Sequence, residues 1–186
     1  MRKILIALGL GSLLISQPIC IARSDGSFPG KGSYTAWVNA NTFLKYGNEA
    51  AQKNDLDRAL DWYKKAVQTY EFDSIYYFNL GNAFSMKGQF HIAEEAYRKA
   101  IDLEDDYFQA WLNLGHAIAK QGRAQEAAKA LRKAASLSQN PVEKAEIEKQ
   151  AAQLDALPGL QAPPAPPKEK KKKKEKKIKD KEVTVN

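Results

Sequence analysis

Two histidines, one cysteine and a set of asparagines are the side chains of this chain that could carry chemistry. His91 is followed by Glu94 and Glu95, and in a helix a histidine and a carboxylate three or four residues apart can hold the same metal ion. His116 lies twenty-five residues further on, so the two histidines do not form a pair of ligands. Pairing between surface charges explains His91 and its glutamates without a metal, and we predict no metal site.

Catalytic signatures are missing from the sequence. It contains no phosphate-binding glycine loop, no serine elbow and no zinc-protease motif. The single cysteine, Cys20, lies at the end of an apolar N-terminal segment. We therefore predict that the chain is not an enzyme, has no catalytic residues and needs no cofactor.

The asparagines belong to a repeat of thirty-four residues. The segment YFNLGNAF at 77–84 returns as WLNLGHAI at 111–118. Three units fit without a gap, at 40–73, 74–107 and 108–141, and we number the places in each unit from one to thirty-four. Places four, seven, eight and eleven lie on one side of a helix and are apolar or glycine in every unit: Phe43, Tyr46, Gly47, Ala50; Tyr77, Leu80, Gly81, Phe84; Trp111, Leu114, Gly115, Ile118.

A second apolar stripe follows a break in each unit. The break is at Asn54, Gly88 or Gly122, residue types that tolerate the left-handed conformation in which helices often end. Each unit is therefore predicted to be a hairpin of two helices, which approach closely at small residues such as Gly81 and Ala93. The second stripe consists of Ala59, Tyr63, Ala66; Ala93, Tyr97, Ala100; Ala127, Leu131, Ala134.

This pattern resembles the tetratricopeptide repeat over residues 40–141. The family's succession of Trp, Leu-Gly, Tyr, Ala, Phe and Ala recurs in all three units. The departures are mild: Glu71, Asp105 and Gln139 replace a late proline, and Asn54 replaces a glycine. The resemblance implies an all-α fold, a right-handed α-solenoid of three helix hairpins, and a non-catalytic role as a protein–protein interaction scaffold.

Both ends of such an array must be shielded, because a stack of repeats leaves an apolar surface at each end. At the C-terminal end, residues 142–157 are predicted to form a capping helix, with Asn140 as its N-cap. The residues expected to lie on the last repeat are Val142, Ile147, Ala151 and Leu154. Residues 23–39 are predicted to be a leader and the start of the first helix, where Tyr34, Trp37 and Val38 shield the first repeat.

The polar residues of the first helices fall together, away from the apolar stripe. At about 100° per residue, places two, six, nine and thirteen cluster on this side. In the tetratricopeptide family this side lines the concave surface, so the resemblance implies a groove that binds a protein or peptide partner. Its residues would be Asn41, Lys45, Asn48, Gln52, Asn79, Asn82, Gln109, Asn113, His116 and Lys120, with Leu44, Phe78 and Leu112 at its apolar edge.

The asparagines need an explanation, since Asn within a helix is less favourable than Ala by about half a kcal/mol. An amide offers donors and an acceptor that match the backbone of an extended peptide. Some tetratricopeptide proteins carry such asparagines at the place of Asn79 and Asn113. Binding of a partner polypeptide is one explanation, and the alternative is that the amides tie neighbouring helices together. His116 is expected to form hydrogen bonds in the groove.

Recognition of a free C-terminal carboxylate, as in the cochaperones that this array resembles, is not predicted. Asn48 and Asn79 match two of the five clamp residues of those proteins. The three cationic places are occupied here by Leu44, Gln109 and Asn113. Without these positive charges, a carboxylate has little to pair with.

The first twenty-two residues have the pattern of an export signal. Two basic residues are followed by an apolar run at 4–15 and by small residues at Cys20 and Ala22. We expect cleavage after Ala22 and export to the periplasm or cell envelope of a bacterium. An N-terminal membrane anchor is an alternative, although the run is shorter than a span of about 20 residues. A lipoprotein modified at Cys20 is a second alternative.

The basic character of the chain is concentrated at its C-terminal end. Of the net charge of +7, residues 1–22 carry +2 and residues 168–186, with ten lysines and four acidic residues, carry +6, so that residues 23–167 sum to −1. We expect a proline-rich linker at 158–167 and a disordered tail at 168–186. Export and the lack of interleaved aromatic residues argue against nucleic acid as the partner of this tail.

Two functions follow from these features. In the first, a non-catalytic scaffold binds a partner polypeptide in the concave groove within the cell envelope. In the alternative, an envelope-surface adaptor binds anionic lipid or polymer through Lys168–Lys181, and the repeats serve as a spacer or oligomerisation unit. The sequence identifies neither the partner nor the oligomeric state.

Overall fold

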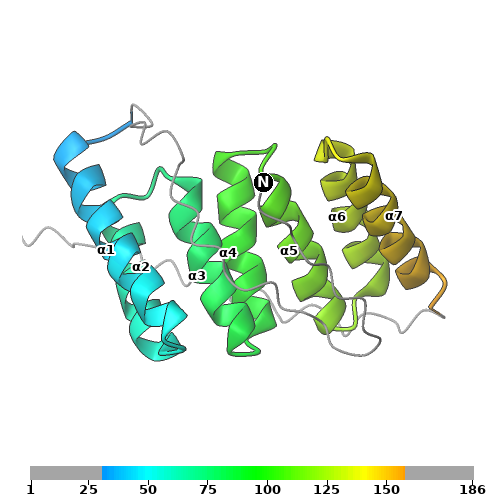
Figure 1. The fold of residues 1–186 in the computed structure, drawn as a ribbon, viewed down its shortest axis with the longest axis horizontal. Coiled ribbons are helices and arrows are strands. Elements are labelled where there is room, and N and C mark those ends of the chain that lie inside the picture. The colour runs from blue at the N-terminus through cyan, green and yellow to red at the C-terminus, as the bar shows by residue number, and fades with distance from the viewer. Residues whose placement is uncertain (1–30, 158–186) are drawn as a thin grey trace, which may run out of the picture.

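The computed structural model describes residues 31–157, which form seven α-helices and contain no strand. The helices are α1 (Tyr34–Gln52), α2 (Leu56–Thr69), α3 (Ser74–Met86), α4 (Phe90–Leu103), α5 (Phe108–Lys120), α6 (Ala124–Leu137) and α7 (Pro141–Asp155). They stand side by side in chain order, with α1 and α7 at opposite ends of the row (Figure 1). The predicted all-α fold built from helix hairpins is confirmed. Ser74 and Phe108, at which the second and third predicted units begin, are the first residues of α3 and α5.

The turn inside each hairpin is made by the residue that the sequence marked as a break. Asn54, Gly88 and Gly122 have φ angles of 59°, 73° and 80°, which lie in the left-handed region that favours glycine and asparagine. In the first two turns the next residue donates its backbone N–H back to the carbonyl of Ala50 or Phe84, both at 2.9 Å. The prediction of these three breaks is confirmed.

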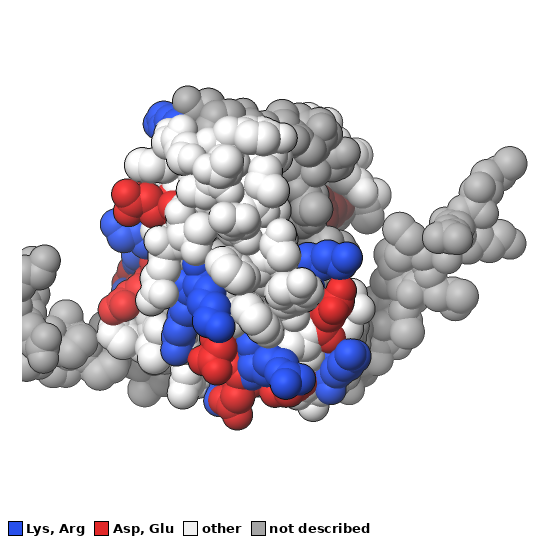
Figure 2. Space-filling view, turned by 90° about the vertical axis from the view of Figure 1, so that its left-hand side faces the viewer, with Lys and Arg blue, Asp and Glu red and all other residues white. Residues whose placement is uncertain are grey.

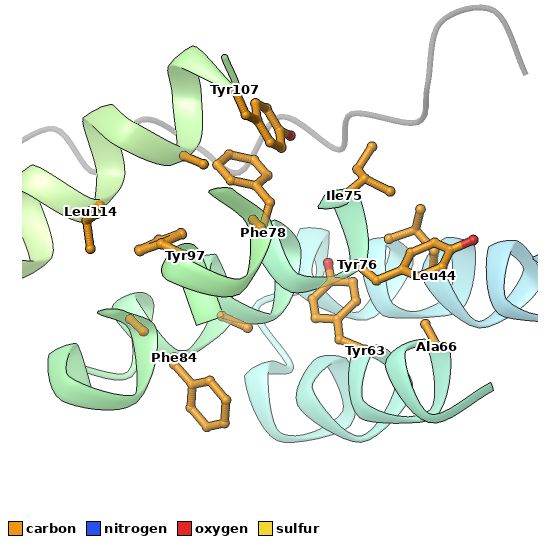
Figure 3. Packing of buried hydrophobic residues seen from close by; sticks show 14 of the residues in the cluster. Leu44, Tyr63, Ala66, Ile75, Tyr76, Phe78, Phe84, Tyr97, Tyr107 and Leu114 are labelled. Carbon is orange, nitrogen blue, oxygen red and sulfur yellow. The ribbon is translucent and has the colours of Figure 1, made fainter. Parts of the chain in front are cut away.

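The core runs through all the hairpins, and its tightest points are the glycines at place eight. A Cβ atom at Gly47 would lie 2.4 Å from the ring of Tyr63, and one at Gly81 would lie 2.7 Å from the ring of Tyr97. Both tyrosine rings are buried between the helices (Figure 3). Glycine is therefore required at these places because the ring of the second helix lies directly against the first helix.

The helix α7 closes the C-terminal end of the row. Asn140 accepts hydrogen bonds from the backbone N–H of Val142 at 3.0 Å and of Glu143 at 3.4 Å, as expected for an N-cap. Ile147 and Ala151 are buried against α6. The placement of Val142 on the last repeat is wrong, since this side chain is 76% exposed. Val142 precedes Ile147 by five residues, about 140° around the helix, and so lies on another side.

Several predicted segments fall outside the described residues. They are the export signal at 1–22, residues 23–30 of the leader predicted at 23–39, the proline-rich linker at 158–167 and the lysine-rich tail at 168–186. Between residues 31 and 157, no helix combines the length and the apolar character that crossing a membrane requires. The start of the first helix is described: α1 begins at Tyr34 with Ser33 as its N-cap, and Trp37 is buried.

Candidate functional site

The predicted groove residues belong to one side of α1, α3 and α5, which we call the amide face (places two, six, nine and thirteen of each unit). Their exposure falls into three groups. The exposed residues are Lys45, Gln52, Gln109 and Lys120; the half-buried residues are Asn41, Asn48, Leu112, Asn113 and His116; the buried residues are Leu44, Phe78, Asn79 and Asn82. The amide face therefore has a buried middle, on α3, between two more open ends.

The asparagines at place nine bond to a tyrosine in the second helix of their own unit. The hydroxyl of Tyr63 donates to Oδ1 of Asn48 at 2.8 Å, and the hydroxyl of Tyr97 donates to Oδ1 of Asn82, also at 2.8 Å. The two partners are fifteen residues apart in both cases. Both bonds join neighbouring helices, which is the alternative that the sequence analysis left open for the amides, but the tyrosine partners were not predicted. The signal was present: asparagine and tyrosine occur together in the first two units, and neither occurs at these places in the third.

Asn82 also joins two units. Nδ2 of Asn113, on α5, donates to Oδ1 of Asn82 on α3 at 2.9 Å. One carbonyl oxygen thus accepts from α4 through Tyr97 and from α5 through Asn113. Since a carbonyl oxygen has two lone pairs, its capacity is filled. The alternative in which amides tie neighbouring helices together therefore describes Asn82 and the Nδ2 group of Asn113.

Two further asparagines bond to the backbone of their own helix. Nδ2 of Asn41 donates to the carbonyl of Trp37 at 3.1 Å, and Nδ2 of Asn79 donates to the carbonyl of Ile75 at 2.8 Å. Within the described residues, Oδ1 of Asn79 is buried and has no hydrogen-bond partner. A buried acceptor without a donor costs about 1–3 kcal/mol, and burial keeps a partner from reaching this oxygen in the described structure.

The apolar residues of place five do not lie at a groove edge as predicted. Leu44 and Phe78 are each 3% exposed and belong to the core. The ring of Phe78 lies 5.0 Å from that of Tyr107, between the centroids, and Figure 3 shows the two rings side by side. Leu112 is partly buried against a smaller cluster formed mainly by α6 and α7. The ring of Phe78 also lies 6.1 Å from that of Tyr97 on α4, between the centroids, so place five packs inside the row of helices and not at a surface.

His116 occupies place nine of the third unit and contacts the capping helix. Its Nε2 lies 3.3 Å from Oε1 of Gln150 on α7. Burial lowers the pKa of His116, Lys120 lowers it further, and the hydrogen bond to Gln150 opposes both. The neutral imidazole is thus the favoured form, and it links α5 to α7.

The carboxylate of Glu94 is the centre of a polar cluster that the sequence did not indicate. It accepts from Arg98 at 2.9 Å, from Gln121 at 2.8 Å and from Arg123 at 2.6 Å, and both arginines also contact Glu126. Burial alone would raise the pKa of Glu94, but the bonds from Gln121, Arg123 and Arg98 lower it. The cluster ties α4 to the turn between α5 and α6.

The metal site considered for His91 does not form around Glu94. Nε2 of His91 lies 3.5 Å from Oε1 of Glu95, while Glu94 is directed to the arginines. Residues 31–157 contain no group of three or more His, Cys, Asp or Glu side chains placed to hold a metal ion. What the amide face offers chemically is hydrogen-bond donors, a few acceptors and the ammonium groups of two lysines.

Comparison with known proteins gives one family match and many structural matches. A family model described as tetratricopeptide repeat matches residues 78–141. No curated protein matches the chain. A tetratricopeptide domain of OM64 from Arabidopsis superimposes with a TM-score of 0.59 at 26% identity, covering 63% of this chain and 98% of that one.

Two further solved structures resemble the fold. The first tetratricopeptide domain of Spaghetti (RPAP3), bound to the HSP90 peptide SRMEEVD, gives a TM-score of 0.61 at 22% identity, covering 64% of this chain and 95% of its own. The type III secretion chaperone SycD of Yersinia enterocolitica, in complex with a peptide of the translocator YopD, gives 0.58 at 16% identity, covering 66% and 93%. At these identities the likeness concerns the fold alone.

The family has a general character that agrees with the site. The tetratricopeptide repeat is generally a non-catalytic protein-interaction fold, and the three helix hairpins between Tyr34 and Leu137 have its arrangement. The glycines at place eight and the left-handed turns of each hairpin are where its pattern requires them. The family match over residues 78–141 and these structural likenesses support placing the chain in the tetratricopeptide-repeat family.

Proposed function

We propose that this protein is a non-catalytic scaffold that holds an extended segment of a partner polypeptide against the amide face. The observation that carries the proposal is a set of exposed polar side chains along that face, Lys45 on α1 and Gln109 and Lys120 on α5. None of the three makes a hydrogen bond or ion pair within residues 31–157.

Structural relatives support this reading. Spaghetti and SycD were each solved with a bound peptide. In the present chain, the Oδ1 atoms of Asn48 and Asn82 already accept hydrogen bonds from Tyr63 and Tyr97. Fewer asparagines are therefore available to a partner than the sequence suggested. We therefore assign the principal contacts to Lys45, Gln109, Asn113 and Lys120.

A partner that ends in a free carboxylate is not part of the proposal. Leu44, at one of the three cationic places of the cochaperone clamp, is buried, and Gln109 and Asn113 at the other two are neutral. The partner segment is instead expected to offer backbone groups to amides and an acidic or carbonyl oxygen to Lys45 and Lys120.

The test is site-specific photo-crosslinking in the native cell extract. A photoreactive residue is placed in turn at Lys45, Gln109 and Lys120, and the adducts are analysed by mass spectrometry. We expect one partner sequence at all three positions, with crosslinked residues that follow one another in order, because an extended segment crosses α1 and α5 in sequence.

The matched control carries the photoreactive residue at Lys129, an exposed lysine on α6 away from the amide face. It should give no adduct with the same segment. A partner that crosslinks equally from Lys129, or three unrelated partners at the three positions of the amide face, would rule the proposal out.

The second candidate function rests on charge. Residues 168–186 carry +6, whereas residues 23–167 sum to −1, and polybasic segments bind anionic membranes with roughly 1 kcal/mol per basic residue. We propose this adaptor role as the rival. Sedimentation with vesicles containing anionic lipid, at low and high salt, with and without residues 168–186, separates the two functions: the rival fails when binding survives the deletion.

Both candidates place the protein in the bacterial cell envelope, and this location is itself a proposal. It rests on the pattern of residues 1–22. Mass spectrometry of the protein purified from its cells should give Arg23 as the first residue. An intact Met1 would support the membrane anchor, and a lipid on Cys20 the lipoprotein.

A further inference from the structure

The N-terminal end of the helix row differs from every internal junction between hairpins. Places three, seven and ten of the first helix face the preceding unit. Five of the six residues at these places in α3 and α5 are buried, and the sixth, Leu80, is half-buried: Tyr76, Leu80, Ala83; Ala110, Leu114, Ala117. The preceding hairpin covers them, as the 6.4 Å contact between the rings of Tyr70 and Tyr76 illustrates. In α1 the corresponding residues, Thr42, Tyr46 and Glu49, are all exposed.

This uncovered end carries an aromatic cluster. The ring of Trp62, on α2, lies 5.7 Å from that of Phe43 and 5.1 Å from that of Tyr46, both on α1. Tyr46 is 42% exposed. At the place of Trp62 the later units have Ala96 and Ala130, both buried. A large aromatic residue thus stands where the other units need only alanine, and it stands at the end of α1 and α2 that no other helix of residues 31–157 covers.

A hollow of about 460 Å³ lies beside the cluster. Tyr46, Trp62 and Ala50 form its apolar part, and its charged lining is balanced, with the acids Glu49 and Asp55 and the bases Lys53 and Arg58. Nζ of Lys65 also lies 4.2 Å from the centroid of the Trp62 ring. Figure 2, which views this end of the molecule, shows an uncharged strip with lysine, arginine, aspartate and glutamate side chains intermixed beside it. Tyrosine, tryptophan and arginine are the residue types that dominate the energetics of protein interfaces.

From this end face we infer that the protein forms a twofold dimer, in which the end face of α1 and α2 packs on the same face of a second copy. The balance of charge favours this occupant, because a face with two acids and two bases beside an apolar centre can pair its acids with the bases of a second copy in a twofold arrangement. A partner of one charge sign would leave half of these groups opposed.

The far end of the molecule disfavours a head-to-tail arrangement. There the row is closed by α7, whose exposed residues include Glu143, Lys144, Glu146, Glu148 and Lys149. The exposed large apolar residues of this end, Val142 and Leu157, lie at opposite ends of the charged surface, so it offers no continuous apolar area to the rings of Tyr46 and Trp62. The matching surface on a second copy is therefore the identical end face, and the assembly closes as a dimer.

The dimer would change how the protein binds. Joining at the N-terminal ends leaves both amide faces uncovered and places the two α7 helices at the outer ends (Figure 1). A partner with two binding segments, or an anionic surface in contact with two tails, would then be held twice. Such double attachment raises the apparent affinity by roughly 10²–10⁴ when the geometry permits it.

The test is sedimentation equilibrium of the purified full chain and of two variants over a range of concentrations. The wild-type chain should approach twice the monomer mass of 20.7 kDa as concentration rises. Tyr46→Lys introduces like charges across the twofold axis and should raise the dissociation constant about tenfold or more. Trp62→Ala should act in the same direction and retain the fold, because alanine occupies that place in the other units.

The matched control is Ile92→Lys. Ile92, on α4, is 40% exposed, close to the exposure of Tyr46, and it lies away from the end face. The Ile92→Lys substitution should leave the dissociation constant of the dimer unchanged. Circular dichroism should report equal helicity for all variants. A wild-type chain that stays monomeric overturns the inference, and so does a dimer that Tyr46→Lys and Trp62→Ala leave intact.

Discussion

The first two repeats and the third solve the same packing problem in different ways. In the first two, the glycine of place eight lies against a tyrosine ring whose hydroxyl bonds to the asparagine of place nine: Tyr63 to Asn48 and Tyr97 to Asn82. In the third, the glycine lies against Leu131, and place nine holds His116. Leucine has no hydroxyl, and His116 bonds instead to Gln150 of α7.

The residue at place nine therefore depends on its neighbour in the second helix. A buried tyrosine hydroxyl needs an acceptor, and an asparagine on the paired first helix, fifteen residues earlier, supplies it. In the third repeat this tyrosine is absent, and the side chain at place nine, His116, bonds to the following element, which is the capping helix α7. The predictions below alter the glycine, the hydroxyl and the histidine in turn.

The largest difference is expected from adding one methyl group at place eight. In Gly81→Ala the new Cβ would lie 2.7 Å from Cε1 of Tyr97, a rigid ring held at its far end by Asn82. Overpacking of this kind costs about 1–3 kcal/mol, against about 1 kcal/mol gained from better helix propensity. We expect a net loss of stability in urea unfolding followed by circular dichroism.

Gly115→Ala is the matched change in the third repeat. Its Cβ would lie 2.7 Å from Cδ2 and 2.8 Å from Cγ of Leu131, and 3.2 Å from the backbone nitrogen of that residue. The leucine side chain can change its rotamer, whereas the tyrosine ring cannot bend, so Gly115→Ala should lose less stability than Gly81→Ala. An equal or greater loss for Gly115→Ala would contradict the proposed difference between ring and leucine.

A smaller effect is expected from removing the hydroxyls. Tyr97→Phe leaves Oδ1 of Asn82 with Asn113 as its remaining donor and should cost about 1 kcal/mol. Tyr63→Phe should cost less, because its bond to Asn48 is only partly buried and water can replace the hydroxyl. Urea midpoints of both variants, with the slope of the transition unchanged, check the order. The reverse order would mean that burial does not control the strength of these bonds.

The fold could be predicted from the sequence because its signals are local and recur. A spacing of three and four residues, a glycine at place eight and a left-handed turn residue each repeat three times, so chance matches are averaged out. Val142 was misplaced for the opposite reason. The capping helix occurs once, and a spacing of five residues was read as if it continued the buried side.

The candidate site was predicted less well because its pattern ignores the neighbouring elements. A helical wheel places Asn48 and Asn82 among the polar residues. It does not include Tyr63 and Tyr97 of the paired helices, whose hydroxyls donate to the Oδ1 atoms of these asparagines. Glu94 was missed for a similar reason. It occupies place twenty-one, where the other units have the buried residues Leu60 and Ala128, and only the structure brings Arg98, Gln121 and Arg123 to it.

The smallest expected effect is a pH dependence of stability that His116 causes and the asparagines of place nine do not, because only the histidine titrates near neutral pH. Burial lowers the pKa of His116 below 6.5 in the folded protein, so between these two pKa values the unfolded chain binds more protons. The stability that neutral His116 contributes should therefore be fully present above pH 6.5. The free energy of unfolding should then fall as the pH is lowered from 6.5 to the folded pKa, by at most about 1.4 kcal/mol per pH unit. In His116→Asn this slope should disappear between pH 7.5 and 5, while His91→Asn, on the exposed side of α4, controls for loss of a histidine. Retention of the slope in His116→Asn would show that protonation of the third repeat's place nine is not linked to folding.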